Sequence, residues 1–360
     1  MSFNEPRLVT KEEEKEKAVK LVIGLDLGGS GTRAVVKGKD KVYQFESALT
    51  LVDKEEYIPE EVKMNDFKAI IHDDTVSYIL KNKGVNYSSS PIRNQKNDSM
   101  KSKDILNKLN CLDAIDNIMR DLKVSNAEVS IVVALPPNEV YTQEVNVFKE
   151  EFKGYYEVCT RDGATTRFKI TFVGAVAEGL TAVYSLSEED LDELYGDHIM
   201  IIDGGYRSTD IIIAKELEPV EAGFDSFPIG GISLESKVAY AFKSKMDPQN
   251  KDGITSAISE GIANRTKAGG LVYLVKESMA PAIYDNMVSV CALADVPISS
   301  IGMFVFTGRL FNSGGSMEEE GTFSPSIADF IMKKLINSPF KVIDGLGNIN
   351  GLKAILEDVE

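Results

Sequence analysis

Two glycine-rich turns, each preceded by an apolar run and an aspartate, hold the residue types best suited to phosphate chemistry in this sequence. The first lies in the segment IGLDLGGSGTRAVV and the second in IIDGGYRSTDIII. Alignment of Asp26 with Asp203 also places Thr32 on Thr209, at an offset of 177 residues. Glycine allows positive φ and lets backbone N–H groups approach phosphate oxygens. Two matching turns therefore predict a pair of phosphate-binding hairpins that meet at one cleft.

The turns also hold candidate ligands for a cation. Asp26 and Asp203 each end an apolar strand, where a buried carboxylate is costly without a positive partner. A Mg²⁺ ion bound largely through its water molecules would offset that cost, so both aspartates are candidate metal ligands through water. For Arg207 two interpretations stay open, a contact with phosphate or crowding of the turn. The candidate phosphate ligands are Asp26, Gly28, Gly29, Ser30, Gly31 and Thr32 in the first turn, and Gly204, Gly205, Arg207, Ser208 and Thr209 in the second.

Several common nucleotide-binding and catalytic motifs are absent from the sequence. The P-loop pattern G-x-x-x-x-G-K-[ST] does not occur, and each turn leads into a predicted strand rather than a helix, which also excludes the Rossmann fingerprint. His72 and His198 stand outside any triad motif, and the three cysteines form no C-x-x-C pair. This pattern disfavours a zinc site or a disulfide framework and fits a reducing cytoplasm.

The charge of the chain limits its partners. Its 360 residues include 40 Lys and Arg against 56 Asp and Glu, a formal net charge of −16. Such an excess disfavours direct binding to nucleic acid, because counterion release requires clustered positive side chains. No apolar run reaches the ~18 residues needed to span a bilayer. We therefore expect a cytoplasmic protein without a membrane partner.

The elements that must position the two turns alternate between buried strands and helices, which is typical of an α/β fold. Residues 1–20 are expected to form a charged N-terminal extension. Polar inserts near 86–103 and 312–322 are expected to be exposed loops, with subunit contact as the alternative. Periodicity predicts strands at 21–27, 33–36, 129–135, 170–173 and 199–202, and helices at 106–122, 175–186 and 327–336.

These motifs resemble the actin, heat-shock-chaperone and sugar-kinase superfamily, in which two related lobes clamp ATP between hairpins of the D-x-G type. The resemblance implies an actin-like α/β fold of two duplicated ribonuclease-H-like lobes around a nucleotide cleft. It places residues 21–180 and 330–360 in lobe I and residues 181–329 in lobe II. Overall size and the stretch VSIVVALPP before a polar helix are most similar to the ParM-like bacterial actins, which segregate plasmids.

The resemblance also implies roles for residues outside the turns. The segment FVGAVAEGLTAVY is similar to the first inter-lobe helix, and its Glu178 matches the residue that orients the attacking water. Glu178 and Asp203 are thus the expected catalytic residues. The segment MFVFTGR resembles the adenosine motif, which assigns Gly308 and Arg309 to the nucleotide. Glu260 is a candidate ribose ligand, with a solvated surface position as the alternative for both Glu260 and Arg309.

The function that the resemblance implies is an ATPase, with GTP left open as the nucleotide, that polymerises into filaments. It would segregate plasmid DNA through a basic DNA-binding adaptor of ParR type, and like-charged subunits would make the filaments salt-sensitive. The alternative is a sugar or acyl kinase of the same superfamily, although Arg161-Asp162-Gly163 lacks a clear kinase signature. A chaperone ATPase is a third reading, disfavoured because we expect no C-terminal peptide-binding domain.

Overall fold

The structure is a computed structural model of the chain, and it divides into two compact units. The first comprises Met1–Leu135, Glu139–Val176 and Leu352–Glu360, and the second comprises Pro136–Asn138 and Ala177–Gly351. The residues that the structure describes are 18–28, 31–45, 49–52, 67–73, 75–81, 101–160, 162–192, 197–241, 267–308, 310–311, 326–335, 338–343 and 345–359. The predicted extension up to residue 17 and the predicted loops at 86–100 and 312–322 lie outside these ranges.

One sheet organises the described part of the first unit, with nine strands in the order β3-β2-β1-β7-β9-β8-β5-β6-β4. Two adjacent interior strands, β1 and β7, are largely apolar and buried, as expected for strands covered on both faces, whereas β9 alternates between buried and more exposed residues. The strands are β1 (Val19–Gly28), β2 (Gly31–Val36), β3 (Val42–Phe45), β4 (Leu49–Val52), β5 (Phe67–His72), β6 (Thr75–Lys81), β7 (Asn126–Leu135), β8 (Gly154–Thr160) and β9 (Thr165–Ala177).

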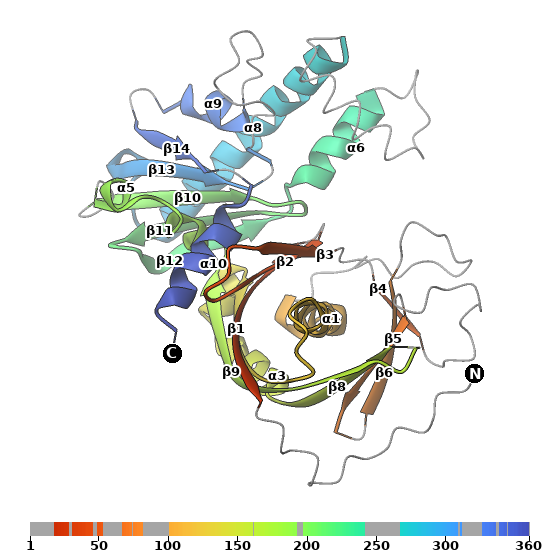
Figure 1. Cartoon of the computed structure of the whole chain (residues 1–360). Coiled ribbons are helices and arrows are strands. Elements are labelled where there is room, and N and C mark those ends of the chain that lie inside the picture. The colour runs from red at the N-terminus through yellow and green to blue at the C-terminus, as the bar shows by residue number, and fades with distance from the viewer. Residues whose placement is uncertain are drawn as a thin grey trace. The chain divides into compact units, whose positions relative to one another are not determined.

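The helix α1 (Ile105–Asp121) forms the centre of this unit, and Figure 1 shows the sheet curving around it. Most of its circumference is buried, including two carboxylates, those of Asp113 and Asp116. Lys68 of β5 donates a hydrogen bond of 2.6 Å to each of them. These charges can be buried because each has an opposite charge within hydrogen-bond distance.

The second unit is built on a five-stranded sheet in the order β12-β11-β10-β13-β14. The helix α8 packs on β11 and β12, and α6 and α9 pack on α8 (Figure 1). The strands are β10 (His198–Gly204), β11 (Thr209–Lys215), β12 (Glu218–Phe227), β13 (Ile301–Thr307) and β14 (Phe340–Val342). The remaining helices of the two units are α2 (Pro137–Val140), α3 (Glu144–Phe152), α4 (Leu180–Val183), α5 (Glu188–Asp192), α6 (Gly231–Ala241), α8 (Lys267–Leu293), α9 (Ile327–Met332) and α10 (Gly347–Glu357), with the 3₁₀ turns η3 (Lys101–Lys103) and η4 (Ile298–Ser300).

Residues 330–351 lie in the second unit, whereas the sequence analysis placed them in lobe I. The reason is local packing. The strand β14 pairs in parallel with β13, and Phe330 and Ile331 of α9 belong to the apolar core of the second sheet. Only the C-terminal part of α10 joins the first unit, where a Cβ on Gly24 of β1 would lie 3.3 Å from the Cβ of Leu352.

No helix in the described residues is long and apolar enough to cross a membrane, and this includes α8 with its 27 residues.

Candidate functional site

The two glycine-rich turns close two β-hairpins that have the same register. In the first, β1 pairs with β2 so that Asp26 lies opposite Arg33. In the second, β10 pairs with β11 so that Asp203 lies opposite Asp210. The offset of 177 residues therefore holds for both strands of each hairpin, which confirms the internal repeat.

The repeat extends to a third strand on the other side of each aspartate. The strand β1 also pairs in parallel with β7, which places Asp26 beside Ala134. In the same way β10 pairs in parallel with β13 and places Asp203 beside Thr307. Each aspartate thus sits at the carboxyl end of an interior strand, where open α/β sheets bind their ligands.

In the first hairpin, Asp26 is buried and faces a positive side chain. The Nη1 atom of Arg33 lies 3.6 Å from its Oδ2 atom. Burial raises the pKa of the Asp26 carboxyl, while Arg33 and Lys101 oppose the rise. A Cβ on Gly28 would lie only 2.8 Å from the carbonyl oxygen of Gly31, so this position requires glycine. Thr32 is described and buried, whereas the predicted ligands Gly29 and Ser30 lie outside the described residues.

The buried carboxylate of Glu139, which the sequence analysis missed, holds the backbone at Lys101. Lys101 is one of the two cations that oppose the pKa rise of Asp26. Glu139 follows the end of β7 and accepts hydrogen bonds of 2.7 Å from the backbone N–H groups of both Lys101 and Ser102. Two such bonds satisfy a buried carboxylate and fix the start of the segment that leads into α1. The predicted loop at 86–103 is therefore ordered at its end, where Ser102 is buried.

The turn of the second hairpin is fixed by the segment that precedes α6. The N–H of Gly205 donates to the carbonyl of Ser208 at 2.9 Å, and the N–H of Gly231 donates to the carbonyl of Gly205 at 3.0 Å. The Thr209 hydroxyl donates to the carbonyl of Ile229 at 2.6 Å. That proton is thus used within the protein and is not available to a phosphate at this turn.

Arg207 and its neighbour occupy the tip of the same turn. The Arg207 side chain is exposed, whereas its backbone packs against Gly230, where a Cβ would lie 2.6 Å from the Arg207 carbonyl carbon. The Tyr206 hydroxyl donates to the Glu235 carboxylate of α6 at 3.0 Å. The glycine pair before α6 is therefore needed because the turn lies directly on its backbone.

Three chain segments surround the Asp203 carboxylate, which is buried. The Nδ2 atom of Asn348 donates to its Oδ2 atom at 2.7 Å. Gly308 has a φ of +86°, and a Cβ there would lie 2.5 Å from the Oδ1 atom of Asp203. Gly179 has a φ of +78°, and a Cβ there would lie 3.3 Å from the Cβ of Asp203. Glycine at both positions allows the backbone to approach the carboxylate.

Glu178 lies in a turn rather than on a helix, so the predicted helix at 175–186 is wrong in its extent. The strand β9 continues to Ala177, and α4 spans only Leu180–Val183. The positive φ of Gly179 separates the two elements, because a right-handed helix cannot contain it. Glu178 is 5% exposed and belongs to the second unit, one residue from the glycine that packs against Asp203.

Asn348 is a second residue that the sequence analysis missed. Besides its bond to Asp203, its Oδ1 atom accepts a hydrogen bond of 3.0 Å from the backbone N–H of Gly179. It therefore joins the turn of Glu178 to the second hairpin. The available signal was weak, an asparagine in the first turn of a helix between two glycines, Gly347 and Gly351.

The carboxylates fit a hydrated magnesium ion better than a metal held by protein ligands alone. Among the residues that the structure describes, no group of three or more His, Cys, Asp or Glu could hold a metal ion. Mg²⁺ usually keeps several waters and takes one or two carboxylates beside nucleotide phosphates. Asp26 and Asp203 each offer one buried carboxylate at a strand end, which suits that mode. The predicted ligands Glu260 and Arg309 lie outside the described residues.

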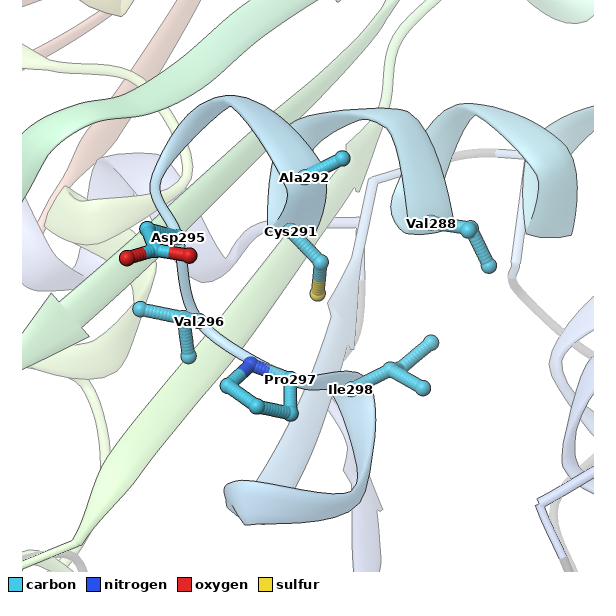
Figure 2. Close-up of a pocket in the computed structure, with 7 residues that line it drawn as sticks. All are labelled: Val288, Cys291, Ala292, Asp295, Val296, Pro297 and Ile298. Atoms are coloured by element: carbon cyan, nitrogen blue, oxygen red, sulfur yellow. The ribbon is translucent and has the colours of Figure 1, made fainter.

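A shallow pocket of about 280 Å³ at the C-terminal end of α8 has a different character. Figure 2 shows the Cys291 sulfur directed toward Pro297 and Ile298. Burial raises the pKa of the Cys291 thiol to about 11, so it is protonated at neutral pH. The lining of the pocket is mainly apolar and lacks the hydrogen-bond donors that a phosphate needs. The lining residues are Val288, Cys291, Ala292, Asp295, Val296, Pro297 and Ile298.

No protein-family model matches this chain, and no curated protein matches its sequence. Solved structures match over nearly its whole length. The actin-like protein Alp7A matches with a TM-score of 0.69 and 12% identity, covering 94% of this chain and 96% of its own. The archaeal actin homologue Ta0583 matches with a TM-score of 0.66 and 18% identity, covering 94% and 100%. A 15-stranded ParM filament from Clostridium botulinum matches with a TM-score of 0.60 and 15% identity, covering 93% and 98%.

These structures share one architecture with the present chain, with a mixed α/β composition and two sheets. The match to Ta0583 covers 94% of this chain, so it extends over both units. The protein therefore has the actin-like fold, as the sequence resemblance to the actin-like superfamily implied.

Proposed function

We propose that this protein is an actin-like ATPase that polymerises into filaments. One observation carries the proposal: two hairpins of identical register place an aspartate, Asp26 or Asp203, at the end of an interior strand. The solved structures of similar fold support it, because they include Ta0583 in complex with ADP and ParM in a filament.

ATP is the nucleotide that we propose, with GTP as the alternative. Its phosphates would accept hydrogen bonds from backbone N–H groups in the two glycine-rich turns. Gly308 and Arg309 would lie at the adenosine, and Glu260 at the ribose, as the sequence resemblance implies. Asp26 and Asp203 would hold Mg²⁺ through its water molecules, and the ion would neutralise part of the phosphate charge.

Glu178 would orient the water that attacks the γ-phosphate. Its carboxylate can accept a hydrogen bond from that water, and its burial limits competition from bulk solvent. Phosphoryl transfer depends mostly on positioning and charge stabilisation, so a carboxylate fixed in a short turn suits the task. The 13-residue strand β9 before the turn and the helix α4 after it supply that rigidity.

The cellular role that we propose is plasmid segregation through an adaptor. A filament requires two different surfaces that bind each other without closing a ring. The net charge of −16 disfavours direct contact with DNA, so a basic adaptor protein of ParR type would connect the filament to its cargo.

The first experiment measures light scattering and phosphate release by the full-length chain after addition of ATP and Mg²⁺. Filament formation raises the scattering, and hydrolysis releases phosphate without any added acceptor. A sugar or acyl kinase would give no scattering and would consume ATP only with a phosphoryl acceptor. That second result would overturn the proposal.

Replacement of Glu178 with Ala is expected to slow phosphate release about 100-fold or more, because orientation of the attacking water is lost. Nucleotide binding, measured by fluorescence of a labelled ATP analogue, should persist. Glu188→Ala is the matched control, since Glu188 is exposed on α5. Equal hydrolysis rates for the two variants would exclude the assigned role of Glu178.

A further inference from the structure

The side-chain amide of Asn348 is engaged at both ends within the second unit. Its Nδ2 group donates to the Asp203 carboxylate at 2.7 Å, and its Oδ1 atom accepts from the Gly179 N–H at 3.0 Å. The partners settle the orientation of the amide. An ionised carboxylate can only accept and a backbone N–H can only donate, so a flipped amide would lose both bonds.

Close backbone packing fixes the helix that presents Asn348. A Cβ on Gly347 would lie 2.8 Å from the Thr307 hydroxyl oxygen and 2.9 Å from the Ala182 Cβ. A Cβ on Gly351, four residues along, would collide with the carbonyl of Thr181 in α4. The first turn of α10 therefore lies directly on α4, which follows the turn of Glu178.

We propose that Asn348 is a positioning residue that holds the Asp203 carboxylate and the Glu178–Gly179 turn in one fixed arrangement. This inference rests on the proposed function, because it assigns the purpose of that arrangement to ATP hydrolysis. Asn348 touches two groups that must act together, the carboxylate at the end of β10 and the backbone beside Glu178. Neither of those contacts can be made by a nonpolar residue of the same size.

The substitution Asn348→Asp separates positioning from packing. Aspartate has nearly the same shape and still accepts from the Gly179 N–H. It replaces the donor to Asp203 with a second carboxylate at about the same distance, and two carboxylates in such contact cannot both ionise freely. A residue that merely fills space would tolerate this change.

Asn350→Asp is the matched control. Asn350 is exposed on the same helix, two residues along, so the control adds the same charge to the first turns of α10 without facing Asp203. The Asn348→Ala variant removes both hydrogen bonds. It remains informative if the aspartate variant does not fold.

The experiment measures kcat and KM for ATP with Mg²⁺ in the full-length wild-type and variant proteins. It also measures amide hydrogen exchange at Gly179 without nucleotide. We expect Asn348→Asp to lower kcat about 10–100-fold, as for other residues that orient a functional group, with a smaller change in KM. We expect Asn348→Ala to lose exchange protection at Gly179, and Asn350→Asp to match the wild type in both measurements.

The outcomes separate this inference from the proposed function. A wild-type chain that does not hydrolyse ATP would overturn the proposed function, and this inference with it. A wild-type chain that hydrolyses ATP while Asn348→Asp and Asn348→Ala keep its kcat would overturn the inference alone. A fall in kcat that Asn350→Asp shares equally would also overturn it, because a general charge effect on α10 would then be the cause.

Discussion

The two hairpins have the same backbone, but their aspartates have different partners. Asp26 lies opposite Arg33, a cation 3.6 Å away, whereas Asp203 lies opposite Asp210 and accepts from the neutral amide of Asn348. The two hairpins thus share the register and the position of the carboxylate, while the charges around it differ. Equivalent carboxylates in a repeat can therefore serve different purposes.

The glycines of the two hairpins also serve different purposes. In the first, Gly28 lies against the backbone of Gly31 within its own turn. In the second, Gly204 is approached by another segment, since a Cβ there would lie 2.5 Å from the Cβ of Leu310. The first hairpin needs glycine for its own closure, and the second needs it for the packing of its neighbours.

The largest effect is expected at Gly308, which belongs to the surroundings of Asp203. Gly308→Ala combines a positive φ with a Cβ 2.5 Å from both the Asp203 carboxylate and the carbonyl of Gly204. Strain from the positive φ costs about 1–2 kcal/mol, and overpacking adds about 1–3 kcal/mol. Urea unfolding measures the sum.

Gly163→Ala provides the matched comparison for Gly308→Ala. Gly163 has the same φ of +86°, but nothing lies within 4 Å of a Cβ placed there. Its substitution should cost only the strain of about 1–2 kcal/mol. If both variants lose the same stability, the close approach of Gly308 to Asp203 has no energetic weight.

A smaller effect is expected in the first hairpin, at the cation opposite Asp26. Arg33→Met leaves the buried carboxylate without this partner, which should cost about 1–3 kcal/mol at neutral pH. Because burial already raises the pKa of Asp26 and Arg33 opposes that rise, the variant raises the pKa further. A raised acid pKa favours the folded state at low pH and disfavours it as pH rises through the folded value. The difference in stability between wild type and variant should therefore narrow as pH falls toward 4, measured by urea unfolding across pH.

Arg167→Met is the control for the Arg33 variant. Arg167 pairs with Glu157 at 3.0 Å, but nearly half of its side chain is exposed. An exposed pair contributes only about 0–1 kcal/mol. A loss at Arg33 no larger than at Arg167 would show that the first hairpin does not depend on its cation.

The sequence predicted the hairpins well because their signals are local. Turn glycines, an aspartate and flanking apolar strands lie within one short segment, and the 177-residue offset matches the observed register in both copies. The contacts of Asn348 and Glu139 could not be predicted in this way. Asn348 meets Asp203 across 145 residues, and Glu139 meets Lys101 across 38. Such pairs depend on how the elements pack, which no local pattern encodes.

At the turn of Glu178 the local sequence pattern predicted a helix that the structure does not contain. Small and apolar residues around Glu178 indicated a helix. The φ of +78° at Gly179 is incompatible with a right-handed helix, so no helix continues through this position. Glycine is compatible with both outcomes, so the sequence pattern alone could not decide between them.

The smallest effect, of opposite sign, is expected at Asp210, the residue that most clearly distinguishes the second hairpin. Like charges directly opposite each other in antiparallel strands destabilise a sheet by about 0.2–1 kcal/mol. Asp210→Asn removes that repulsion from Asp203 at almost constant shape, so the nucleotide-free protein should become more stable by this amount in urea unfolding. Glu218→Gln is the control, because Glu218 lies at the exposed start of β12, opposite Lys215 of β11. Destabilisation by Asp210→Asn would mean that the second hairpin requires the charge of Asp210. The contrast between the hairpins would then lie in that requirement rather than in repulsion between the two aspartates.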